Sequence, residues 1–125
     1  IRDRKYGVDV ISMISPTSEE RIARIAKEAT GFIYVVSSMG VTGVRSEIHT
    51  DLAKIIEKIR SVTDVPCAIG FGISTPEQAE KMAALADGAI VGSAIVKIVA
   101  EYKEEAAQPL YDYVASMKQA VLAAR

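Results

Sequence analysis

Glycine-rich turns are the part of this sequence best suited to chemistry, and the chemistry they suit is the binding of an anion. Three apolar runs each end in glycine, at residues 40–43, 70–72 and 92–94, and Ser93 adds a hydroxyl donor in the last. A glycine lets a ligand approach the backbone, and free amides at a helix start favour a negative charge. Tight turns also use glycine for purely steric reasons. Three such turns at one edge of a parallel sheet together predict a phosphate site.

Side chains suited to acid–base catalysis are scattered. Glu19 and Glu20 fall in the first turn of a predicted helix, where they serve the helix dipole. Asp87 precedes the fourth predicted strand, at the end opposite the glycine turns. His49 stands before Thr50, a predicted helix N-cap, and is expected to be solvated. We therefore predict no catalytic residue in this chain.

Lys97 and Cys67 each have a functional and a structural interpretation. Lys97 lies one turn beyond Ser93 and either interacts with a bound anion or faces solvent. Cys67, the single cysteine, lies within an apolar run, where a buried structural thiol is expected rather than a nucleophile. One histidine, one cysteine and scattered carboxylates predict no metal site.

Strand-like and helix-like segments alternate four times along the chain. Short runs rich in Val and Ile predict parallel strands at residues 8–15, 32–38, 66–72 and 88–93. Two of the segments between them carry apolar stripes at helical spacing, formed by Ile22, Ile25, Ala26 and Ala29, and by Leu52, Ile55, Ile56 and Ile59. The order predicts an α/β fold of four βα units, a single (βα)4 half-barrel over residues 1–125.

Capping signals mark where the predicted helices start. Thr17 with Glu20 forms one capping box, and Thr75 with Pro76 and Gln78 forms another. Residues 1–7 have the pattern of the last turn of a helix that Gly7 caps, so a preceding helix body is expected to be missing.

The C-terminal region predicts two helices and looks complete. One helix covers residues 94–102. The final helix is expected to face inward with the side that carries Leu110, Val114, Met117 and Val121. Three tyrosines are expected to pack these helices with their hydroxyls in water, namely Tyr102, Tyr111 and Tyr113. Four parallel strands cannot close on themselves, so both sheet edges and one face need a complementary half-barrel or a second copy of the chain.

Composition excludes several classes of function. The 125 residues are 50% hydrophobic, which suits one domain with a core. Fifteen Lys and Arg balance 16 Asp and Glu without clustering, so neither nucleic acid nor an anionic membrane is an expected partner. No apolar stretch reaches the length of a membrane span and no signal peptide is evident, so a cytoplasmic setting is expected.

Three motifs carry a family resemblance. The segments YVVSSMGVTG (residues 34–43), IGFGIS (69–74) and VGSAIVKI (91–98), in this order and spacing, resemble the tryptophan synthase alpha subunit. The resemblance covers essentially the whole chain but only strands five to eight of that family's (β/α)8 barrel. It implies the C-terminal half of a lyase that cleaves indole-3-glycerol phosphate to indole and glyceraldehyde 3-phosphate.

The resemblance also implies a substrate site. The residues it places around the glycerol phosphate are Gly43, Phe71, Gly72, Gly92 and Ser93. Tyr34 corresponds to a tyrosine beside the indole-binding region, and Thr42 to the threonine of the mobile loop six. Ser38 stands where the family often has arginine.

The same resemblance implies what this chain lacks. The family's general acid and base follow strand two, outside this sequence, so the chain alone is expected to be inactive. No cofactor is implied for it, since pyridoxal phosphate belongs to the beta subunit, the family's usual partner. The alternatives are a non-catalytic half-barrel that forms a homodimer, and a flavodoxin-like nucleotide-binding domain, against which stands the lack of a P-loop or Gly-x-Gly-x-x-Gly motif.

Overall fold

The computed structural model describes residues 3–16, 19–37, 45–70 and 72–124. Its strands are β1 (Ser12–Ile14), β2 (Ile33–Val36), β3 (Cys67–Gly70) and β4 (Gly88–Ala89), which form one sheet in that order. Its α-helices are α1 (Glu19–Glu28), α2 (Arg45–Arg60), α3 (Pro76–Leu85), α4 (Ser93–Tyr102) and α5 (Ala107–Ala123). Two 3₁₀ turns, η1 (Asp3–Tyr6) and η2 (Lys103–Glu105), complete the order. All strand pairs are parallel, which confirms the predicted fold class.

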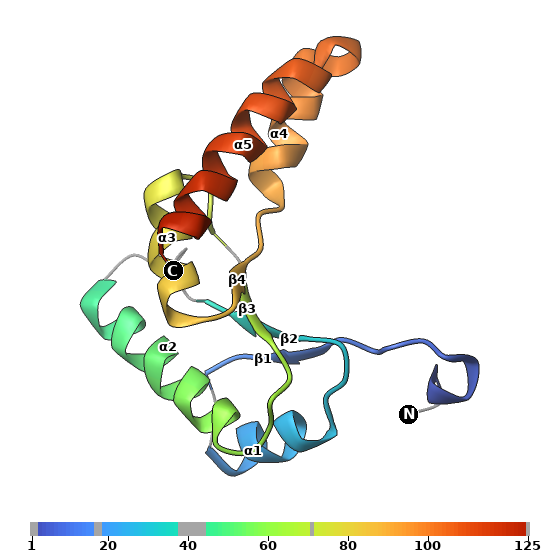
Figure 1. Cartoon of the computed structure of the whole chain (residues 1–125), viewed down its shortest axis with the longest axis vertical. Coiled ribbons are helices and arrows are strands. Elements are labelled where there is room, and N and C mark those ends of the chain that lie inside the picture. Colours follow the sequence, from blue (N-terminus) through green and yellow to red (C-terminus); the bar gives the residue numbers. More distant parts are fainter. Residues whose placement is uncertain (1–2, 17–18, 38–44, 71, 125) are drawn as a thin grey trace.

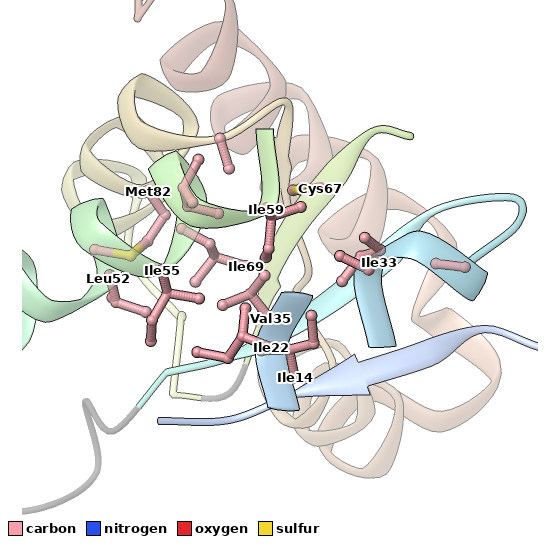
Figure 2. Close-up of a cluster of buried hydrophobic side chains, with 14 of the residues drawn as sticks. Ile14, Ile22, Ile33, Val35, Leu52, Ile55, Ile59, Cys67, Ile69 and Met82 are labelled. Carbon is pink, nitrogen blue, oxygen red and sulfur yellow. The ribbon is translucent and has the colours of Figure 1, made fainter. Parts of the chain in front are cut away.

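One face of the sheet makes the core. Alternate residues of a strand point to opposite faces, and the register aligns Ile14 with Val35 and Val35 with Ile69. These three side chains are at most 1% exposed, and Figure 2 shows them meeting side chains of the helices, Ile22 and Leu52 among them. The predicted helical stripes are confirmed, because all eight residues lie in this cluster or pack against it.

The other face of the sheet is open. Helices α1, α2 and α3 lie on the same side of the strands (Figure 1). Met13 is 60% exposed although its neighbour Ile14 is 1% exposed. Tyr34 and Ala68, which continue the row of Met13 across the sheet, are partly exposed. The described part of the chain therefore leaves an apolar sheet face in contact with solvent.

All four strands are shorter than predicted, and the two edge strands are shortened most. Only residues 12–14 of the predicted strand 8–15 and residues 88–89 of the predicted strand 88–93 are paired, whereas each central strand pairs over four residues. An edge strand has a hydrogen-bonding neighbour on one side only, so its ladder ends where the inner strand turns away. Val8 and Val10 are 56% and 51% exposed beyond the paired part of β1.

Of the predicted helix N-caps that the described structure tests, one is wrong and one is confirmed. Helix α2 begins at Arg45, so the prediction that Thr50 is an N-cap is wrong, and His49 also lies within the helix. The capping box before α3 is confirmed: the Gln78 amide donates to Thr75 Oγ1 over 3.2 Å, and the Thr75 amide donates to Gln78 Oε1 over 3.1 Å. Thr17 lies outside the described residues. Gly7 follows η1 with φ +70°, as a cap requires.

The C-terminal helices α4 and α5 run side by side and project beyond the sheet (Figure 1). Met117 is buried and Leu110 and Val121 are partly buried, but Val114 is 50% exposed, contrary to the predicted inward face. None of the described helices combines the length and the apolar character that a membrane span needs.

The tyrosine prediction is largely wrong. Tyr111 is 71% exposed and Tyr102 is 45% exposed, so neither is packed between helices. Tyr113 does pack against the core, but its hydroxyl donates to the carbonyl of Ser74 over 2.6 Å. Burial raises the pKa of this phenol above 10.0. The bond ties α5 to the segment just before α3.

Cys67 and Asp87 fasten the amino ends of β3 and β4. The Cys67 amide donates to Asp87 Oδ2 and the Asp87 amide donates to the Cys67 carbonyl, both over 2.9 Å. Arg60 forms an ion pair with Asp87 over 3.5 Å. Cys67 is 1% exposed, which confirms a structural thiol, and burial, followed by the nearby charge of Asp87, raises its pKa above 9.0.

This pKa shift predicts a loss of stability in alkali. The unfolded chain ionises its thiol near 9.0, whereas the folded chain keeps it neutral to higher pH. The contribution of the neutral, buried thiol to the free energy of unfolding is therefore complete below pH 9 and is lost as the pH rises through the pKa of the folded state. Over that range the free energy of unfolding falls by up to about 1.4 kcal/mol per pH unit. Urea unfolding at pH 7, 9 and 10 measures it. Cys67→Ala should lose this part of the slope, and an identical slope in both proteins would contradict the assignment.

Candidate functional site at the carboxyl edge of the sheet

The described structure contains four of the seven predicted site residues. Tyr34 lies on β2, Gly72 follows β3, and Gly92 and Ser93 form the start of α4. The other three, Thr42, Gly43 and Phe71, lie outside the described residues. The four described positions follow or face the carboxyl ends of parallel strands, which is the edge where the sequence predicted a phosphate site.

Tyr34 owes its position to Gly70. A Cβ added at Gly70, the last residue of β3, would overlap the phenol ring of Tyr34. The missing side chain thus lets the ring lie across β3, with its hydroxyl at the carboxyl end of the strand. Sequence reasoning assigned residues 70–72 as a group to ligand approach and missed this internal role. An aromatic residue and a glycine on adjacent strands were the available signal.

Gly72 has a structural role in the backbone. It is exposed and has φ +80°, a conformation that costs other L-residues about 1–2 kcal/mol. The next residue, Ile73, is 3% exposed and belongs to the core. The left-handed turn therefore lets the chain leave the strand and return a side chain to the core within two residues.

The capping box of α3 already engages several donors at the start of this helix. Gln78 Oε1 accepts hydrogen bonds from the amides of Ser74 and Thr75 over 2.9 and 3.1 Å, and from Ser74 Oγ over 3.3 Å. The amides of Ser74 and Thr75 are thus engaged within the chain. The expectation of free amides at this helix start is wrong for these two residues, and it stays a prediction for Gly72.

The start of α4 differs, because Gly92 makes no side-chain cap. The amides of Ile95 and Val96 both donate to the Gly92 carbonyl, over 3.0 and 3.1 Å. The amides of Ser93 and Ala94 precede them and point out of the first turn, as the first donors of any helix do. A Cβ at Gly92 would meet no described atom within 4 Å, and Ser93 is exposed. This helix start has both the donors and the room for an anion.

Other candidate groups lie away from this edge or face solvent. Lys97 is exposed on α4, which favours its solvent-facing interpretation. Asp87 lies at the amino ends of the strands, as predicted, and is engaged with Cys67 and Arg60. Within the described ranges, no group of three His, Cys, Asp or Glu residues is placed to hold a metal ion.

Four consecutive parallel βα units with their helices on one face of the sheet have the arrangement of part of a (β/α)8 barrel. A solved tryptophan synthase subunit alpha from Campylobacter jejuni matches with a TM-score of 0.81 and 32% identity, over 92% of this chain and 46% of that one.

Sequence comparison gives the family. The sequence model of the tryptophan synthase alpha chain family matches residues 3–123. The alpha chain of Lacticaseibacillus casei is 53% identical over 117 residues, and that of Lactiplantibacillus plantarum is 54% identical over 117 residues. The chain therefore belongs to the tryptophan synthase alpha chain family. It spans 44% of the length of each of these curated relatives, although they cover 94% and 93% of it.

The substitution Gly70→Ala tests whether the absence of a side chain at Gly70 makes room for the ring of Tyr34. The new methyl group should displace the phenol ring, which is the outer end of a partly exposed side chain, and so lower the free energy of unfolding by only about 1 kcal/mol. In the Tyr34→Ala background the same substitution should cost less than about 0.5 kcal/mol, because the overlap is gone. Urea unfolding of the four proteins forms the double-mutant cycle. Equal costs in both backgrounds would show that Gly70 does not serve Tyr34.

Proposed function

We propose that this chain is the phosphate-binding, C-terminal half of an enzyme that cleaves indole-3-glycerol phosphate, corresponding to strands five to eight of the barrel. The observation that carries the proposal is the start of α4, where Gly92 leaves open space and no side-chain cap. Membership of the tryptophan synthase alpha chain family supports the substrate class.

In this proposal the phosphate group accepts hydrogen bonds from the amides and hydroxyl at Ser93 and from the turn at Gly72. The dipole of α4 adds about 0.3–1 kcal/mol for an anion at its start, and each hydrogen bond to a charged group adds about 1.5–3 kcal/mol before the cost of ordering the ligand. Binding by this half alone should therefore be weak, in the millimolar range.

The remaining site residues have roles beside the phosphate. Tyr34 lines the region that receives the indole ring, and its hydroxyl at the end of β3 suits a polar contact there. Gly43 and Phe71 complete the phosphate site, and Thr42 belongs to a loop that closes over the substrate. These three assignments rest on the family motif.

The proposed chemistry is a retro-aldol cleavage that needs a general acid and a general base. We place both in the remainder of the barrel, which this sequence does not include, so the chain alone binds without turnover. The complete protein would pass indole to a beta subunit that uses pyridoxal phosphate. A cytoplasmic location is part of the same proposal.

An NMR titration of the purified chain with glycerol 3-phosphate tests the site. We expect saturable amide shifts at the five predicted phosphate contacts, namely Gly43, Phe71, Gly72, Gly92 and Ser93. Gly92→Leu should weaken binding at least about tenfold, because its side chain fills the space over the helix start. Ala100→Leu, which introduces the same side chain at an exposed position of the same helix, should leave binding unchanged. A folded spectrum without shifts at these amides would contradict the proposal.

Gly92→Asp separates binding from folding. Aspartate is a favoured N-cap and should stabilise α4, yet its charge repels phosphate. The expected result is a protein at least as stable as the parent that no longer binds glycerol 3-phosphate. In a full-length enzyme carrying this half, Gly92→Leu should raise KM for indole-3-glycerol phosphate, and an unchanged KM would count against the site.

A further inference from the structure

Both backbone polar groups of Ser74 are held by side chains of the helices α3 and α5. Its amide donates to Gln78 Oε1 over 2.9 Å, and its carbonyl accepts from the Tyr113 hydroxyl over 2.6 Å. Ser74 precedes Thr75, the N-cap of α3, and the ladder of that helix begins with the Ala79 amide on the Thr75 carbonyl. The carbonyl of Ser74 therefore stands outside the helix and needs a donor from elsewhere. Tyr113 supplies it.

The bond from Tyr113 joins segments that are far apart in the sequence. Tyr113 lies on α5, 39 residues after Ser74, and α5 packs beside both α3 and α4 (Figure 1). The Tyr113 ring packs against the core and lines a groove together with Val91 and Ile95, which precede and follow the N-cap of α4. One side chain thus reaches from beside the start of α4 to the start of α3.

The restraint on Ser74 extends to Gly72. Each residue has only two soft backbone dihedrals, so those of Gly72 and Ile73 alone separate the amides of residues 72 and 74. Ile73 is 3% exposed and belongs to the core, which holds the chain from the inner side. Gly72 is exposed with φ +80°. Holding Ser74 at both of its backbone groups therefore limits the directions in which the Gly72 amide can point.

We infer that Tyr113 is a positioning residue for the phosphate site: by holding the Ser74 carbonyl, it keeps the Gly72 amide directed at the bound phosphate. The inference rests on the proposed function, because it takes the phosphate to bind at Gly72 and Ser93. Tyr113 acts through the turn and does not touch the ligand, since its one proton is donated to Ser74. Burial raises the pKa of this phenol, so the hydroxyl remains a donor at neutral pH.

A fixed turn matters because the proposed phosphate contacts come from two separate turns. Hydrogen bonds weaken steeply as their angle departs from linearity, so the donors at Gly72 and Ser93 must be aligned at the same time. Donors that are held in place before binding reduce the ordering cost that the ligand must meet. Ser74, Gln78 and Tyr113 all belong to this chain, so the restraint does not depend on the remainder of the barrel.

Tyr113→Phe removes the hydroxyl and keeps the ring that packs against the core. In an NMR titration of the purified chain with glycerol 3-phosphate, its Kd should rise about two- to tenfold, the factor that loss of one hydrogen bond gives. The shift of the Gly72 amide at saturation should shrink, whereas that of the Ser93 amide should be retained. Tyr111→Phe makes the same chemical change at a 71% exposed position of the same helix and should behave like the parent.

The outcomes separate this inference from the proposed function. A parent chain without saturable shifts would overturn the proposed function and the inference with it. A parent chain that binds, with the same Kd and the same Gly72 shift in Tyr113→Phe, would overturn the inference only. Urea unfolding of the three proteins gives the structural comparison, because a bond that serves stability alone would weaken folding and leave the Gly72 shift unchanged.

Kinetics of a full-length enzyme carrying this half give a second readout. Tyr113→Phe should raise KM for indole-3-glycerol phosphate about two- to tenfold and change kcat less than about twofold, because a phosphate contact acts equally in the ground state and the transition state. Ser74→Ala keeps both backbone bonds and should behave like the parent. A lower kcat at unchanged KM in Tyr113→Phe, or an equal rise of KM in Ser74→Ala, would overturn the inference.

Discussion

The packing of one sheet face against three helices is the interaction on which the rest of this structure depends. Ile14, Val35 and Ile69 stand side by side across three strands and are at most 1% exposed. Each buried side chain of this kind contributes about 1.5–3 kcal/mol through removal from water. The pleat that points these residues to the helices points Met13 and Tyr34 to the opposite face. One set of contacts thus fixes both the core and the orientation of the open surface.

The sheet also fixes the position of the candidate site. Parallel strands bring their carboxyl ends to one edge, so Gly72 and Gly92, 20 residues apart in sequence, lie after neighbouring strands. At the opposite edge, Asp87 links the amino ends of β3 and β4 through Cys67. Hydrogen bonds within the chain hold the amino edge and, through Gln78, the start of α3 at the carboxyl edge, whereas the start of α4 has no side-chain cap.

Sequence patterns predicted the parts of the fold that depend on periodic burial. The stripes through Ile22 and Ile59 were found because helical spacing repeats over several turns, and the capping box at Thr75 because its three residues are diagnostic. The lengths of all four strands were overestimated, most of all at the sheet edges, since pairing depends on a neighbour that local sequence does not reveal. Thr50 was misplaced as a cap because α2 continues more than one turn before it.

The candidate site was predictable as a set of turns but not in its internal roles. Glycine spacing and the family motif pointed to residues 70–72 together, yet Gly70 accommodates Tyr34 and Gly72 makes a left-handed turn. Gln78 was found as part of a capping box, but the number of donors it engages depends on the conformation of residues 74–75. Such distinctions come from contacts between residues that no periodicity relates.

The contrast between the starts of α3 and α4 gives the two helices different relations to solvent and ligand. Helix α3 carries its own acceptor for its first donors and is complete without help, whereas α4 begins at a residue with no side chain to offer. Water or an anion must accept the hydrogen bonds of its first amides. The fraction of time that this turn stays helical therefore depends on what occupies the space next to it. By mass action, an anion bound there would also stabilise the first turn of α4.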